Sequence, residues 1–162
     1  MLGVCQSDVN CYGSAMKRLV LDDFIPYRLS VTSNLVSDTI ARTYESLYGL
    51  SIPQWRLITV LAENPGVTQQ AIGLRTRMDK VTVSRAAIAL VERGLLGRSA
   101  NVDDRRSHLL ELTDAGRDLY AVVAPKALEL ERRIFSQFRR EEVATFTAML
   151  QRIEAITLSL EG

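Results

Sequence analysis

Short polar and apolar side chains gather at the start of a helix that the sequence predicts over residues 80–93. Threonine, serine and valine are mediocre helix formers, so a stable helix has no need of them in its exposed first turn. A helix that enters the major groove of DNA does need short side chains there, because they let its backbone approach the base edges. Hydroxyl groups then bind phosphates or bases, valine contacts a thymine methyl group, and arginine binds guanine O6 and N7 together. The candidate DNA-contacting residues of this helix are Lys80, Val81, Thr82, Ser84 and Arg85.

The segment downstream argues against the simpler alternative, an ordinary solvated helix face. Residues 95–99 and 108–112 alternate as β-strands do, and residues 101–104 make the turn between them. A hairpin with a basic tip is an arm that can reach the adjacent minor groove. The side chains predicted to act in this arm are Arg98 at its base and Asp104, Arg105 and Arg106 at its tip. The carboxylate beside these arginines is predicted to orient them rather than to act as a catalytic acid.

Capping residues and helix breakers mark the elements that must position these side chains. A helix over residues 22–48 ends at Gly49, and the box from Ser51 to Gln54 starts a second helix that stops at Asn64-Pro65-Gly66. Thr68, Asp79 and Thr113 have the side chains that cap helix N-termini. The remaining predicted helices cover residues 69–77, 80–93, 114–138 and 141–160, with Pro125 expected to kink the third of these.

Composition places the chain among globular proteins, and its charge is segregated. The 162 residues are 47% apolar and carry a net charge of only +1. Residues 68–106 hold eight basic and four acidic side chains, a net of +4, which leaves −3 for the remainder. A basic lobe on an acidic body is a better footprint of a nucleic-acid-binding protein than total charge. No apolar run approaches the ~18 residues of a membrane span, and we see no secretory signal.

The predicted fold is mainly α with a small two-stranded β-wing. Residues 50–112 form a winged helix-turn-helix lobe, residues 21–49 and 113–162 form dimerisation helices, and residues 1–20 form an extension. The outer helices carry more apolar surface than the small lobe covers, so a second copy of the chain is expected to bury it. Double-stranded DNA and a homodimer partner are therefore the expected partners, with no membrane.

Four motifs give this chain a specific resemblance to the MarR family of winged helix-turn-helix regulators. The motifs are Met78-Asp79-Lys80-Val81-Thr82-Val83-Ser84-Arg85, Glu92-Arg93-Gly94-Leu95-Leu96, Asp103-Asp104-Arg105-Arg106 and Leu112-Thr113-Asp114-Ala115-Gly116. The resemblance implies a homodimer that binds pseudo-palindromic operators, usually as a repressor, with half-sites ~10 bp apart. It also implies that residues 80–93 are the recognition helix and that Arg105 or Arg106 enters the minor groove. The chain departs from the family at Gly73, commonly alanine, and at Ile88 and Ala89, which replace positions that are usually charged.

The resemblance also implies a small-molecule effector, because many family members leave DNA when they bind phenolic or other aromatic acids. Aromatic walls and a guanidinium suit such an anion. The candidate residues are Tyr27, Arg28, Trp55 and Arg56. The alternative is that Trp55 fills the core, Tyr27 packs at the dimer interface and both arginines are solvated.

Redox and catalytic functions have little support in the sequence. Cys5 and Cys11 lie upstream of the reactive cysteine of the peroxide-sensing branch, and neither has a neighbouring cation to lower its pKa. Two cysteines cannot staple a domain of this size, so a reducing cytoplasm is the expected setting. The chain has no glycine-rich phosphate loop or nucleophile motif, and its one histidine makes a metal site difficult. We therefore expect no enzyme and no cofactor, and the rival function is a winged-helix module for protein contacts.

Overall fold

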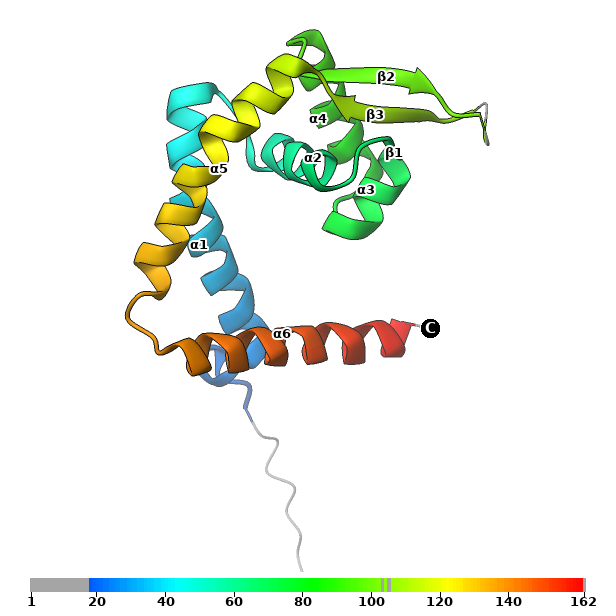
Figure 1. Cartoon of the computed structure of the whole chain (residues 1–162). Helices are drawn as coiled ribbons and strands as arrows, with labels where there is room; N and C mark the ends of the chain where they lie inside the picture. The colour runs from blue at the N-terminus through cyan, green and yellow to red at the C-terminus, as the bar shows by residue number, and fades with distance from the viewer. Residues whose placement is uncertain (1–17, 103, 105, 162) are drawn as a thin grey trace, which may run out of the picture. The chain divides into compact units, whose positions relative to one another are not determined.

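The structure is a computed structural model that describes residues 18–102, 104 and 106–161 of the chain (Figure 1). The chain divides into two compact units, Met1–Leu35 and Val36–Gly162. In the first unit, a short 3₁₀ helix η1 (Leu21–Asp23) precedes the start of the long helix α1 (Ile25–Tyr48). None of the described residues of this unit is buried. The start predicted at residue 22 was therefore three residues early, because the chain turns as a 3₁₀ helix first.

Local capping signals determine where the helices of the second unit begin. Gly49 ends α1 with a φ of 59°, which glycine adopts without steric cost. Helix α2 (Ile52–Glu63) starts with the predicted capping box, in which the Ser51 side chain accepts from the Gln54 amide and the Gln54 side chain accepts from the Ser51 amide. This box satisfies two backbone donors that the first helical turn cannot pair.

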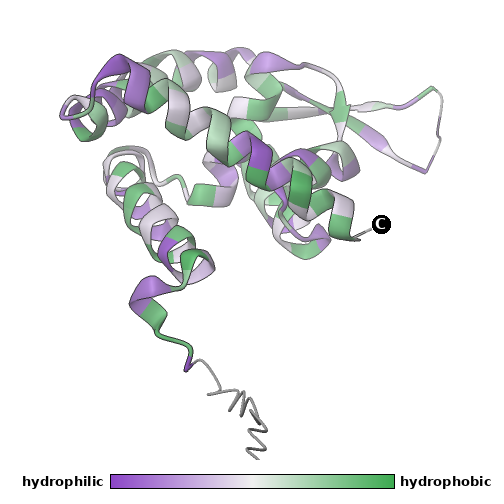
Figure 2. Ribbon diagram, turned by 90° about the horizontal axis from the view of Figure 1, so that it is seen from below, coloured by the Kyte–Doolittle hydropathy of each residue, from purple (hydrophilic) through white to green (hydrophobic). Residues whose placement is uncertain are grey.

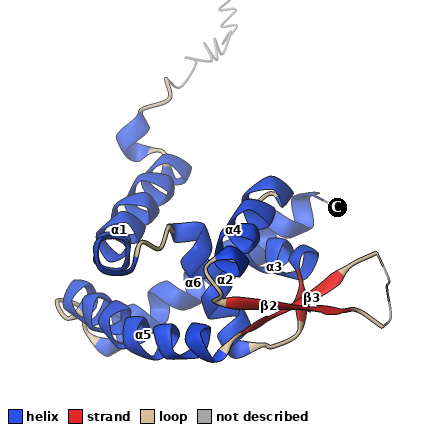
Figure 3. Ribbon diagram, turned by 90° about the horizontal axis from the view of Figure 1, so that it is seen from above, coloured by secondary structure: helices blue, strands red, loops and turns tan. Residues whose placement is uncertain are grey.

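The lobe of the second unit is a helix-turn-helix with a three-stranded antiparallel sheet. Helices α3 (Gln69–Thr76) and α4 (Lys80–Glu92) lie between the short strand β1 (Val67–Thr68) and the hairpin of β2 (Leu96–Ala100) and β3 (His108–Leu112). The sheet order is β1-β3-β2, and Figure 3 shows the hairpin extending beyond the helices. The predicted winged fold is confirmed, and the sheet adds β1 to the two predicted strands. Two residues are too few to show alternation, so sequence analysis could not find this strand.

The core of the lobe is built from the inward faces of α2 and α4 together with β2 and β3. Val83, Ala86, Ala87 and Leu90 are buried on α4, as its helical periodicity predicts. The other buried apolar residues are Ala41, Tyr44, Leu50, Leu57, Ile58, Val60, Leu61, Ile72, Leu95, Leu96, Leu110, Leu112 and Val123. Gly94, also predicted to pack there, is instead exposed in the turn after α4 with a φ of 69°.

Two long helices complete the second unit: α5 (Asp114–Phe135) and α6 (Arg140–Glu161). Helix α5 ends three residues before its predicted end, because the chain turns there and the Phe138 amide donates to the Phe135 carbonyl. No glycine or proline lies in this turn, so sequence analysis had no signal for it. Figure 2 shows hydrophobic and hydrophilic residues alternating along α6, which ends at the C mark. No helix in the described part of the chain is long and apolar enough to cross a membrane.

The start of α5 is fastened to the end of α4 by a close contact. The Thr113 hydroxyl donates to the Gly94 carbonyl at 2.7 Å and accepts from the Gly116 amide at 3.1 Å. The Thr113 amide also donates to the Leu95 carbonyl at 3.1 Å. Gly116 is buried so close to this carbonyl that a β-carbon there would lie 2.2 Å from the Leu95 oxygen. The Leu-Thr-Asp-Ala-Gly motif is therefore a structural joint between the helix-turn-helix and α5.

Candidate nucleic-acid interface

The turn between α3 and α4 places the start of α4 at the surface of the lobe. Arg77 ends α3 in the left-handed region with a φ of 55°. Asp79 then caps α4 by accepting from the Thr82 amide at 2.9 Å. Both N-caps of the helix-turn-helix, Thr68 and Asp79, were predicted from the sequence and are confirmed. The N-terminus of α4 therefore carries free N–H groups and a positive dipole end at an exposed site.

The predicted DNA-contacting residues of α4 divide into exposed and half-buried positions. Lys80, Val81 and Arg85 are exposed, whereas Thr82 and Ser84 are half-buried. Val81 and Arg85 lie one helical turn apart on the side opposite the buried face. Within the described part of the chain Arg85 takes part in no ion pair. Its guanidinium is therefore available to an outside partner.

Thr82 has a structural bond that sequence analysis did not foresee. Its hydroxyl donates to the second carboxylate oxygen of Asp79 at 2.6 Å, so the capping aspartate binds both polar groups of this residue. The hydrogen bond from the hydroxyl is the largest cause that lowers the pKa of Asp79, and the bond from the Thr82 amide is the next. The hydroxyl keeps its lone pairs and can still accept a hydrogen bond, but its proton is engaged.

The lowered pKa of Asp79 predicts a pH dependence of the cap. A carboxyl whose pKa is lower in the folded state than in the unfolded state stabilises the fold at any pH above its unfolded-state pKa. This contribution is lost as the pH falls through the folded-state pKa. We expect the Thr82 amide resonance to titrate with a midpoint below the ordinary pKa of aspartate. Asp79→Asn is the control, since asparagine also caps helices but does not titrate. A midpoint at or above the ordinary value in the wild type would contradict the assignment.

Backbone and side-chain bonds shape the tip of the wing. The Asp104 carboxylate accepts from the backbone amide of Arg106 at 3.0 Å, and the Asp104 carbonyl accepts from the Ser107 amide at 3.0 Å and hydroxyl at 3.2 Å. Asp104 therefore orders the turn through the backbone, whereas sequence analysis assigned it to the arginine side chains. Arg98 and Arg106 are exposed, and Arg105 lies outside the described residues.

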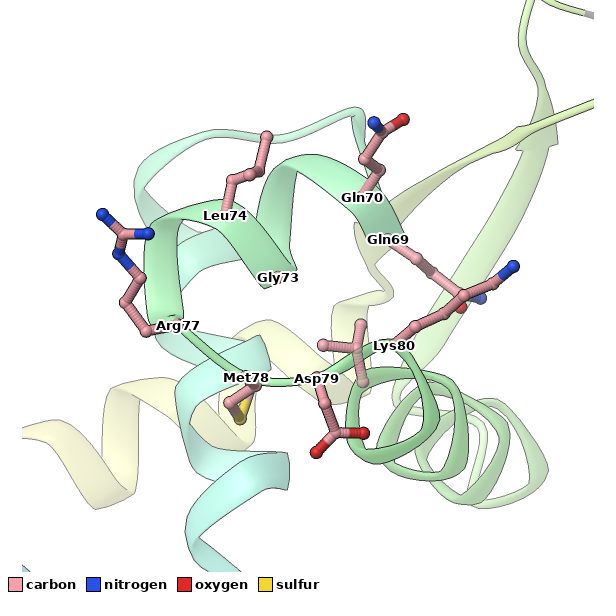
Figure 4. Close-up of a pocket in the computed structure, with 9 residues that line it drawn as sticks. Gln69, Gln70, Gly73, Leu74, Arg77, Met78, Asp79 and Lys80 are labelled. Carbon is pink, nitrogen blue, oxygen red and sulfur yellow. The ribbon is translucent and has the colours of Figure 1, made fainter. Parts of the chain in front are cut away.

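A groove of about 730 Å³ lies between α3 and the start of α4, where Lys80 is one of its lining residues (Figure 4). Besides Asp79, which caps α4, its polar lining consists of Gln69, Gln70, Arg77 and Lys80. Sequence analysis singled out only Lys80 among these four. The available signal was the pair of glutamines directly after the Thr68 cap, because the first helix of a helix-turn-helix commonly crosses the DNA backbone.

Two arginines of the basic segment have structural partners. Arg93 donates to the carbonyls of Gly49 at 3.0 Å and Tyr48 at 2.7 Å, so it caps the C-terminus of α1. Arg75 forms an ion pair with Glu63 of α2. Part of the +4 charge of the segment is therefore used inside the lobe, and the exposed remainder is concentrated on α4 and the wing.

The candidate effector residues lie in different units. Tyr27 and Arg28 are exposed in the first unit. In the second unit, Trp55 packs partly buried against the core, with its ring 5.5 Å from that of Tyr44 and 5.8 Å from that of Tyr120. Burial raises the pKa of the Tyr44 hydroxyl, and the positive charge of Arg56 opposes that shift. The second unit thus contains an aromatic stack with an exposed arginine beside it. Cys5 and Cys11 lie outside the described residues.

Together the helix-turn-helix, the exposed α4 face and the basic hairpin define a winged-helix DNA-binding protein. Residues 48–107 match the sequence model of the MarR family. The chain is 26% identical over 109 residues to the homoprotocatechuate degradative operon repressor of Escherichia coli, covering 67% of this chain and 74% of that one.

Solved structures agree with this match over a larger part of the chain. A MarR family transcriptional regulator from Silicibacter pomeroyi superposes with a TM-score of 0.72 and 26% identity, covering 84% of this chain and 91% of that one. CouR from Rhodococcus jostii, solved with p-coumaroyl-CoA bound, shares the fold with a TM-score of 0.73 and 23% identity over 84% of this chain and 95% of its own. Over residues 48–107 the chain thus matches the MarR family, and over most of its length it has the fold of MarR family transcriptional regulators.

Proposed function

We propose that this chain represses transcription by binding a pseudo-palindromic operator as a homodimer and that a small aromatic acid releases it. The observation that carries the proposal is the exposed face of α4, where Val81 and Arg85 point away from the core beside a capped, free N-terminus. In this proposal α4 enters the major groove, and Lys80, Thr82 and Ser84 contact the bases or the adjoining phosphates.

The wing and the groove supply contacts to the DNA backbone. Arg98 and Arg106, with Arg105 next to Arg106 in the sequence, bind along the adjacent minor groove, whose negative potential attracts arginine. Gln69, Gln70 and Arg77 around the groove between α3 and α4 bind phosphates of the strand that borders the major groove. These contacts position the lobe but do not select a sequence.

Helix α6 supports the homodimer. None of its described residues is buried, although one of its faces is apolar over its whole length. The exposed apolar residues on that face are Phe146, Met149, Leu150, Ile153, Ile156 and Leu160. A contiguous apolar face of this kind marks an interaction surface, and a two-fold axis lets two copies cover it mutually. We propose that this face is part of the dimer interface.

Ile153→Glu tests the dimer. A carboxylate at this 42% exposed position would lose its hydration in the interface, so we expect the sedimentation coefficient to shift towards that of a monomer. Glu154→Gln, on the neighbouring side of α6, is the matched control and should leave the dimer intact. An unchanged dimer in Ile153→Glu would exclude this residue from the interface.

The effector is proposed to bind near Trp55 and Arg56, with Tyr27 and Arg28 as further candidates. The aromatic stack of Tyr44, Trp55 and Tyr120 offers flat apolar surfaces, and Arg56 offers a charge for a carboxylate. CouR, of the same fold, binds p-coumaroyl-CoA, which contains a phenolic ring. The alternative is that the stack serves only to pack the core. If phenolic acids release the bound protein from DNA, the stack is favoured as an effector site; if they do not, core packing is favoured.

The experiment that tests the function is fluorescence anisotropy of the full chain on DNA from upstream of its own gene and on scrambled duplex, across a salt series. We expect preference for the native segment and a steep linear decrease of log affinity with log salt. Absence of binding to DNA at every salt concentration would favour a module for protein contacts.

Arg106→Ala tests the wing. We expect weaker binding to every duplex and a salt slope smaller by about one, because one phosphate contact is lost. Sedimentation should still show the dimer, since Arg106 lies at the tip of the hairpin, between β2 and β3. A salt slope equal to that of the wild type would remove Arg106 from the contact set.

A further inference from the structure

The exposed face of α4 carries two large apolar side chains on either side of an arginine. Val81, Arg85 and Ile88 are four and three residues apart, so they lie within one narrow strip of the helix surface. Val81 is 56% exposed and Ile88 is 44% exposed. The strip is opposite the buried residues of the helix, Val83, Ala86, Ala87 and Leu90. Ile88 is therefore on the outward face, and core packing does not explain it.

The next residue on the strip sets its limit. Glu92 follows Ile88 by four residues and is exposed on the same side of the helix. A carboxylate there repels phosphate, so the part of the strip that suits DNA runs from Val81 to Ile88. The seven steps from Val81 to Ile88 span roughly 10.5 Å at 1.5 Å per residue. That length corresponds to about three base-pair steps of ~3.4 Å each.

Thymine is the base whose chemistry matches the two ends of this strip. In the major groove it is the base that presents a methyl group, and apolar side chains contact it there. A protein partner fits less well, because two side chains around a guanidinium form a much smaller surface than the ~800 Å² per partner of a standard interface. The exposed Lys80 beside the strip also suits the phosphates that flank the bases.

We propose that Ile88 is a specificity-determining residue and that the operator half-site contains thymines on either side of the guanine that Arg85 binds. Val81 contacts the methyl group of one thymine, and Ile88 contacts the methyl group of the other, about three base pairs away. This inference rests on the proposed function, since it assumes that α4 enters the major groove.

The test begins by selecting duplexes from a randomised pool with the full-length protein and deriving the preferred half-site. Each thymine of the half-site is then replaced singly by deoxyuridine, which removes the methyl group and keeps the base pairing. We expect two positions at which the replacement weakens wild-type binding by about threefold to fivefold, as for one buried methyl group. Thymines outside the half-site are the DNA control.

Protein variants assign each methyl group to its side chain. Ile88→Ala should bind the thymine and deoxyuridine duplexes equally at one of the two positions, and Val81→Ala should do so at the other. Val122→Ala removes an exposed valine of α5 and should keep both sensitivities. Specific binding that is insensitive to every deoxyuridine, or an Ile88→Ala variant that keeps both sensitivities, overturns the inference and leaves the proposed function intact. A pool in which no sequence is enriched overturns both.

Discussion

Gly116→Ala is expected to lower the free energy of unfolding by about 1–3 kcal/mol, the usual cost of overpacking a well-packed site. The added β-carbon would lie 2.2 Å from the carbonyl oxygen of Leu95, which belongs to the backbone and cannot rotate away as a side chain would. Alanine is the better helix former by about 1 kcal/mol, so the clash must exceed this gain. Denaturant unfolding followed by circular dichroism measures the difference.

Two other glycines serve as controls for this prediction. At Gly97 in β2 a β-carbon would meet only the Glu111 side chain at 3.7 Å, which is ordinary contact, so Gly97→Ala should change stability little. Gly73 in α3 is intermediate, because its β-carbon would lie 3.2 Å from the carbonyl oxygen of Met78. We therefore expect Gly97→Ala to be the most stable of the three variants, Gly73→Ala to be intermediate and Gly116→Ala to be the least stable. Unfolding of Gly116→Ala at the wild-type denaturant midpoint would show that the joint between α4 and α5 relaxes freely.

Arg85→Ala is expected to cost about 1–3 kcal/mol of specific DNA affinity, roughly a fivefold to 150-fold loss, and to relax discrimination at one base pair. The reason is the loss of a guanidinium that binds two atoms of one guanine. Anisotropy titrations on the preferred duplex, on the duplex changed at that base pair and on random duplex measure the effect. The random duplex should lose less affinity, since it offers the guanidinium only phosphates.

Arg85→Lys is the matched variant for this residue. Lysine keeps the charge but replaces the planar fork by a single point donor, so phosphate attraction persists and paired recognition of guanine weakens. We expect Arg85→Lys to recover binding to random duplex and to recover little of the discrimination. Equal losses on specific and random duplexes for Arg85→Ala would show that Arg85 binds the backbone and does not read a base.

The first prediction concerns the stability of the fold, and the second concerns DNA recognition. Gly116 lies at the joint that fixes α5 to the end of α4, whereas Arg85 lies on the outward face of α4. Gly116→Ala should therefore weaken DNA binding only in proportion to the unfolded fraction, and Arg85→Ala should weaken it in a fully folded protein. Measuring unfolding and binding for both variants separates folding from recognition.

The sequence by itself determined the starts of α2, α3, α4 and α5, the inward face of α4 and the position of β3. Ser51, Thr68, Asp79 and Thr113 cap the helices that they were predicted to cap, because a cap is a bond between residues two or three positions apart. Amphipathic periodicity is equally local, since it depends only on the turn of one helix. The resemblance to the MarR family rested on such short motifs.

Only the tertiary structure decided which of these residues meet across the fold. Arg93 caps α1 by donating to the carbonyls of Gly49 and Tyr48, which precede it by 44 and 45 positions in the chain. Gly116 lies against the Leu95 carbonyl, and Trp55 stacks between Tyr44 and Tyr120. The two-residue strand β1 exists because β3 lies beside it, with Val67 opposite Leu110. Such contacts join residues far apart along the chain, and local propensity contains no information about which distant backbone atom comes within reach.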